Sequence, residues 1–179
     1  MSVRTLDPLL VTGKAIVIIG QWLMAIAGIT LLIALPLAAI FADQITAAMR
    51  LETGNAALAL PLPMILPSMG ICLAIVALMF LFFRNLLRIV RTVSEGDPFV
   101  PANAQRLTHM AWIMLAVEML TLALAPLAYR IGSLMAEETL ASESTDVDLS
   151  GIIMVVTLFI LARVFRQGAA MRDDLEGTV

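Results

Sequence analysis

Four long runs of apolar residues dominate the pattern along this 179-residue chain. They cover about residues 15–41, 64–83, 110–128 and 151–165, and the first contains no charged side chain. Because roughly 20 apolar residues of helix cross the ~30 Å hydrocarbon core of a bilayer, each run predicts a transmembrane helix. The fourth run is the shortest, and it spans the core if Arg163 and Arg166 extend their side chains to the interface. The pattern therefore predicts an all-α, polytopic membrane protein with a single domain over residues 1–179.

Composition agrees with this fold class. The chain is 61% hydrophobic and only 14% charged, whereas roughly half of an ordinary soluble domain is apolar. The lipid bilayer is therefore the first partner that the sequence predicts.

The positions of Lys and Arg predict the orientation of the helices. Cytoplasmic segments of membrane proteins carry an excess of these residues. Two of the eleven, Arg50 and Arg130, lie in the first and third connections, and the third connection is otherwise acidic. The other nine lie in the two ends of the chain and the middle connection: Arg4, Lys14, Arg84, Arg88, Arg91, Arg106, Arg163, Arg166 and Arg172. Both termini are therefore expected in the cytoplasm.

An internal repeat appears when the sequence is shifted along itself by 90 residues. Trp22 then falls on Trp112 and Pro36 falls on Pro126. Matched Trp and Pro residues are more informative than matched Leu residues in apolar helices. The match favours two duplicated helical hairpins that run in the same direction through the membrane.

Three prolines lie inside the predicted spans, at Pro36, Pro67 and Pro126. Proline removes a backbone hydrogen bond and bends a helix. Bends are therefore expected at these positions, toward the outer side of the membrane.

Glu118 is the one ionisable residue well inside a predicted span. A central acidic residue costs roughly 2.5 to 3.5 kcal/mol on insertion scales, so Glu118 is expected to face the protein interior and a polar partner. Thr30, Thr121 and Thr157 lie at similar predicted depth. Glu118 is either part of a proton or cation path or a polar clamp between helices.

A second candidate surface lies in the predicted cytoplasmic segments. Arg84, Arg88 and Arg91 recur at helical spacing and would share one helix face, with Gly96 ending that helix. Arg166 and Arg172 follow the fourth span. These arginines either anchor the helices among anionic lipid headgroups or contact a soluble partner.

The residue patterns of common enzymes are not found in the sequence. The single histidine and the single cysteine, His109 and Cys72, give no nucleophilic set and no metal-ligand spacing. We expect no catalysis, no cofactor, no metal and no direct binding of nucleic acid.

The middle connection and the C-terminal tail carry a family resemblance. The segments 96–99 (GDPF), 165–168 (FRQG) and 171–179 (MRDDLEGTV), together with Asn103, Arg106 and Leu107, resemble the domain-of-unknown-function family numbered 2975. That resemblance implies a small four-span protein of the bacterial inner membrane, often encoded beside a helix-turn-helix DNA-binding regulator.

Two functions remain open from the sequence. In the first, the cytoplasmic loop and tail sequester or signal to a DNA-binding regulator. In the second, the chain is a subunit of a homo-oligomeric carrier or channel that uses Glu118. Four spans are few for a self-contained carrier, so the second function requires oligomers.

Overall fold

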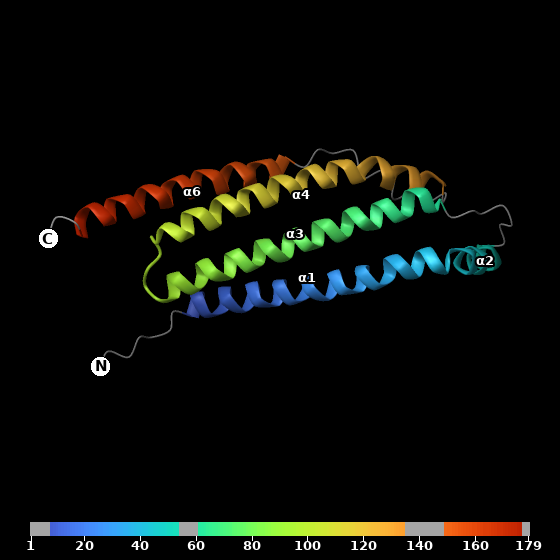
Figure 1. The fold of residues 1–179 in the computed structure, drawn as a ribbon, viewed down its shortest axis with the longest axis horizontal. Helices are drawn as coiled ribbons and strands as arrows, with labels where there is room; N and C mark the ends of the chain where they lie inside the picture. Colours follow the sequence, from blue (N-terminus) through green and yellow to red (C-terminus); the bar gives the residue numbers. More distant parts are fainter. Residues whose placement is uncertain (1–7, 54–60, 135–148, 177–179) are drawn as a thin grey trace. The chain divides into compact units, whose positions relative to one another are not determined.

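The computed structural model describes residues 8–53, 61–134 and 149–176, and every regular element in these ranges is an α-helix (Figure 1). Four helices are long and apolar enough to cross a membrane, which confirms the predicted all-α, four-span fold. The described helices are α1 (Pro8–Ile40), α2 (Ala42–Thr53), α3 (Leu62–Ser94), α4 (Pro101–Leu134) and α6 (Leu149–Glu176).

The long helices extend well beyond the predicted apolar runs. Helices α1 and α3 have 33 residues each, α4 has 34 and α6 has 28, and a 33-residue helix is about 50 Å long. Helix α3 continues past Phe83 and includes Arg84 and Arg91. Helix α4 begins at Pro101, before the apolar run that starts near residue 110. Hydropathy locates the hydrocarbon crossing, whereas the helix continues wherever backbone hydrogen bonds continue.

The three internal prolines lie where the sequence predicts them, inside long helices. Pro36 is in α1, Pro67 in α3 and Pro126 in α4, and the helix continues through each. A bend at each of them stays a prediction.

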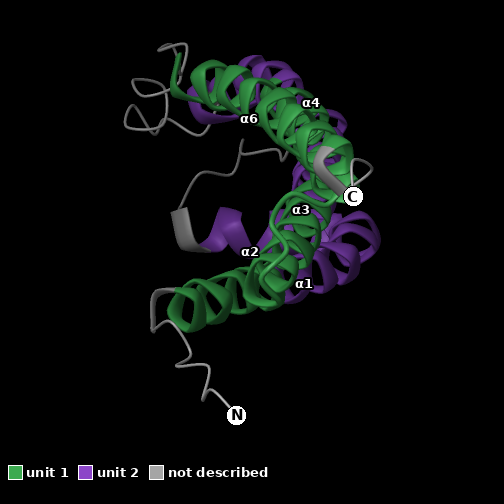
Figure 2. Cartoon of the chain, turned by 90° about the vertical axis from the view of Figure 1, so that its left-hand side faces the viewer, with its two compact units in different colours: residues 1–24, 78–118, 148–179 green, residues 25–77, 119–147 purple. Residues whose placement is uncertain are grey.

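The chain divides into two compact units. Unit 1 comprises residues 1–24, 78–118 and 148–179, and unit 2 comprises residues 25–77 and 119–147 (Figure 2). The prediction of one domain over the whole chain is not tested by this division.

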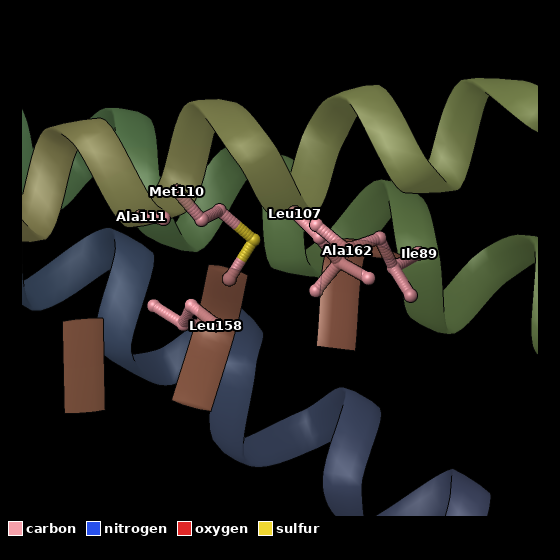
Figure 3. Packing of buried hydrophobic residues seen from close by; sticks show 6 residues of the cluster. All are labelled: Ile89, Leu107, Met110, Ala111, Leu158 and Ala162. Carbon is pink, nitrogen blue, oxygen red and sulfur yellow. The ribbon is translucent and has the colours of Figure 1, made fainter. Parts of the chain in front are cut away.

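Unit 1 holds the cluster of buried apolar side chains shared by α3, α4 and α6. Ala111 on α4 and Ala162 on α6 are almost fully buried, and their small side chains allow the two helices to approach closely. Figure 3 shows the thioether of Met110 pointing toward Leu158. The cluster consists of Ile89, Leu107, Met110, Ala111, Leu158 and Ala162. Helix α4 therefore packs against both α3 and α6 in this unit.

Helix α1 joins unit 1 through a glycine. A β-carbon at Gly20 would lie 2.9 Å from Cε1 of the Phe83 ring on α3. The absence of a side chain at Gly20 therefore lets the phenyl ring of Phe83 lie against the α1 backbone.

Unit 2 exposes most of its apolar surface, as expected of a protein solvated by lipid. The most apolar windows of α1 and α3 contain no buried residue. A β-carbon at Gly28 would make an ordinary contact with Val76, whereas one at Gly70 would meet no atom within 4 Å. The described part of the chain therefore leaves open space beside Gly70.

Helix α2 is the element that the apolar runs did not predict. At a shift of 90 residues, α2 falls on positions 132–143, most of which lie outside the described ranges. The duplication therefore stays a prediction.

Candidate functional site

The connection between α3 and α4 has a defined backbone structure. The amide of Asp97 donates to the carbonyl of Thr92 at 3.0 Å, and the amide of Gly96 donates to Val93 at 3.1 Å. These two bonds, with Gly96 at φ 88°, form a Schellman motif, which favours glycine at the left-handed position. The prediction that Gly96 ends the helix is confirmed.

Helix α4 starts soon afterwards. Pro101 is its first residue, a position where the missing amide hydrogen of proline costs nothing. The amide of Asn103 donates to the carbonyl of Val100 at 2.9 Å. The loop between the two helices is therefore short and fixed at both ends.

The side chain of Asn103 lies at the centre of this connection and is fully buried. Its Nδ2 donates to Oγ1 of Thr92 at 2.7 Å and to the carbonyl of Pro98 at 2.9 Å. The Thr92 hydroxyl in turn donates to the carbonyl of Ile89 at 2.8 Å, so it can only accept from Asn103. An aspartate at 103 could not supply these donors when ionised, so the site requires an amide.

Arg106 completes the hydrogen bonding of this amide. Its Nη1 donates to Oδ1 of Asn103 at 2.8 Å and approaches the carbonyl of Arg88 at 3.5 Å. The guanidinium of Arg106 thus stabilises the turn, and its role differs from that of the exposed arginines nearby.

The last turns of α6 dock against the same loop. The ring of Phe99 packs against Phe165 with 5.4 Å between centroids. A β-carbon at Gly168 would lie 2.7 Å from Cδ1 of Phe99, so the ring lies directly on the α6 backbone. The carboxylate of Asp97 forms an ion pair with Arg172.

These contacts use one face of α6, because residues 165, 168 and 172 recur at helical spacing. We call this site the loop–tail corner. It consists of Thr92, Asp97, Phe99, Asn103, Arg106, Phe165, Gly168 and Arg172. The segments that carry the family resemblance are therefore brought together in space.

The predicted surface arginines lie on α3 and α6, two of the helices that contribute residues to this corner. Arg84, Arg88 and Arg91 are exposed on successive turns of α3, and Arg166 is exposed on α6. Arg172 is engaged with Asp97. The continuous helix through residue 94 places the α3 row on one face, and its role in binding stays a prediction.

Glu118 on α4 lies against a glycine rather than a polar side chain. A β-carbon at the buried Gly151 of α6 would lie 1.9 Å from Oε1 and 2.2 Å from Cδ of Glu118. Glycine has no polar side chain, so the search for polar partners in the sequence missed it.

The pairing of Glu118 with any of the three threonines that the sequence suggested stays a prediction. The hydroxyl of Thr30 donates to Ile26 at 3.0 Å and that of Thr157 donates to Ile153 at 2.8 Å, each in its own helix. The side chain of Thr121 is exposed.

No group of three His, Cys, Asp or Glu side chains that could hold a metal ion occurs within the residues that the structure describes. The corner is held by hydrogen bonds, by aromatic packing and by the ion pair between Asp97 and Arg172.

A family model described as "Protein of unknown function (DUF2975)" matches residues 45–179, well over half of the chain. The chain belongs to the DUF2975 family. The matched region of this DUF2975 protein includes α3, α4 and α6 and therefore the whole loop–tail corner. Searches of curated proteins and of solved structures gave no match.

The contact between Glu118 and Gly151 can be tested by a double-mutant cycle. Gly151→Ala should gain helix propensity, as any helical Gly→Ala change does, but the new methyl group forces the Glu118 carboxyl group away. We expect Gly151→Ala to be about 1 kcal/mol less stabilising than Gly13→Ala, because a β-carbon at Gly13 meets nothing within 4 Å. The measurement is unfolding of the purified protein in detergent. In a Glu118→Ala background the two glycine substitutions should change the stability by equal amounts. An unchanged difference in stability would show that Glu118 does not lie on Gly151.

Proposed function

We propose that this DUF2975 protein is a non-enzymatic membrane partner of a soluble DNA-binding regulator, with the loop–tail corner as its docking site. The observation that carries this proposal is the convergence of the family-typical segments on one corner. These segments come from the α3–α4 loop and the end of α6, which are far apart in sequence. A catalytic or transport site of the family would instead be expected among the apolar parts of the helices.

The surroundings of the corner suit a protein partner. Arg84, Arg88 and Arg91 form an exposed cationic row on α3, the helix that leads into the loop. Phe99 remains 42% exposed although it packs on α6. An exposed aromatic ring in the loop and a cationic row on the helix that leads into it offer an apolar contact and charge complementarity.

The regulator is proposed to be a helix-turn-helix protein, which the family resemblance implies as a common gene neighbour. The membrane protein itself contacts no nucleic acid in this proposal. It holds or releases the regulator, and no cofactor is needed.

A carrier or channel function is the second candidate. Glu118 sits on the buried Gly151, and the structure gives its carboxyl group no hydrogen bond among the described residues. An acidic group of this kind in a membrane helix is a candidate for ion or proton binding. Because four spans are few for such a pathway, this function requires a homo-oligomer.

The proposal requires the corner to face the cytoplasm, which reporter fusions or cysteine accessibility can measure. Labels at Gly96 and Glu176 should be cytoplasmic, and labels at Gly54 and Ser144 should be on the opposite side, because of the distribution of Lys and Arg. Positions 54 and 144 lie outside the described residues, so the test is independent of the structure. A cytoplasmic signal at Ser144 would contradict the orientation.

Removal of the tail tests the docking function. Deleting residues 171–179 removes Arg172 and its ion pair with Asp97, but leaves the buried Ala162 and Ala169 that pack α6. The deletion should abolish co-purification of the regulator from native membranes while insertion is unchanged.

Arg88→Ala should weaken the complex less than the deletion does, by roughly 1 kcal/mol, and should reduce the sensitivity of the complex to salt.

Arg163→Ala is the matched control, because Arg163 is an exposed arginine of α6 outside the corner. Proteins recovered with each variant are identified by mass spectrometry. Equal recovery of a helix-turn-helix protein from the intact and truncated chains would exclude the tail as the docking site. Recovery of no soluble partner from either chain would favour the carrier function.

A further inference from the structure

Helix α2 (Ala42–Thr53) differs from the spanning helices in length and direction. It follows α1 directly at Phe41, whose amide donates to Leu37 and whose carbonyl accepts from Ile45, both at 2.9 Å. Figure 1 shows α2 almost end-on at the end of α1, and Figure 2 shows it from the side, so α2 runs across the direction of α1. Its 12 residues make a helix of about 18 Å, too short to cross a bilayer.

The position of α2 in the chain places it near a membrane surface. The apolar sequence of α1 continues to Ile40 and Phe41, so the chain emerges from the hydrocarbon core where α2 begins. Asp43 and Arg50 exclude α2 from the core itself.

Helical spacing gives α2 three distinct sides. Ala42, Thr46 and Met49 are buried or half-buried and share the side that faces unit 2. A second side is exposed and comprises Phe41, Ile45 and Ala48, and helical spacing places Glu52 of the last turn in the same row. The opposite side is also exposed and comprises Asp43, Ala47 and Arg50.

We propose that α2 is an interfacial helix that binds the bilayer surface. The side with Phe41, Ile45 and Ala48 lies among the upper acyl chains, and the side with Asp43 and Arg50 lies at the headgroups. A helix in the plane of the interface removes these apolar side chains from water while Asp43 and Arg50 stay hydrated, and Glu52 belongs to the last turn, at the end of the helix. The lipid interface is the occupant that fits, because α2 begins where α1 leaves the hydrocarbon core and the third side of α2 is the one that the described residues of unit 2 cover. This inference does not depend on the proposed regulator.

Paired fluorescent labels test the orientation of α2. Cys72 is replaced by alanine, and an environment-sensitive fluorophore is attached at Ile45→Cys or at Ala47→Cys. Both positions are exposed and lie on opposite sides of α2. The full chain is reconstituted in phosphatidylcholine–phosphatidylglycerol vesicles and quenched either with iodide in water or with lipids that carry a doxyl group near the headgroup. A label at Ile33, which is exposed on α1, serves as the control for the acyl region.

The doxyl lipid should quench the label at position 45 roughly twofold or more strongly than the label at position 47. Iodide should quench the label at position 47 more strongly than the label at position 45. Circular dichroism and gel filtration confirm that each labelled protein is folded. Equal iodide quenching at 45 and 47 without lipid quenching would place α2 in water and overturn the proposal. Equal lipid quenching of both labels, or protection of both from both quenchers, would also overturn it.

Discussion

The buried side-chain amide of Asn103 is the interaction on which the loop–tail corner depends. It holds the end of α3, the loop and the start of α4 through Thr92, Pro98 and Arg106. A buried amide that loses its partners costs about 1–3 kcal/mol. Loop conformations that withdraw the Pro98 carbonyl are therefore disfavoured. The conformation that remains directs Asp97 and Phe99 to α6.

The contacts between this loop and α6 are individually weak. Exposed ion pairs such as the one between Asp97 and Arg172 contribute roughly 0–1 kcal/mol. An aromatic pair such as Phe99 and Phe165 contributes about 0.5–1.5 kcal/mol beyond its buried area. Buried Ala111, Leu158 and Ala162 keep α6 on α4 in either case. A protein partner could therefore displace the end of α6 without unfolding the helix.

The sequence predicted those features that leave a periodic or compositional signal. Apolar runs located the four long helices, and the spacing of Arg84, Arg88 and Arg91 together with Gly96 predicted how α3 continues and ends. The contacts at Gly151 and Gly168 could not be predicted, because a glycine does not indicate which side chain will lie on it. Helix α2 was missed because a short amphipathic helix has no long apolar run. Asn103 was noted in the family-typical segment, but its burial depends on the path of the loop.

Cross-linking of the loop to the tail tests the central claim most directly. In a chain with Cys72 replaced by alanine, Asp97→Cys is combined with Arg172→Cys or with Arg163→Cys, and a short thiol cross-linker is added to intact membranes. The account predicts cross-linking of 97 to 172 but little of 97 to 163, because residue 172 shares the docking face of α6 and residue 163 does not. Adding Asn103→Leu should reduce the 97–172 product. Equal yields from both pairs, or no 97–172 product although each cysteine reacts with a maleimide, would contradict it.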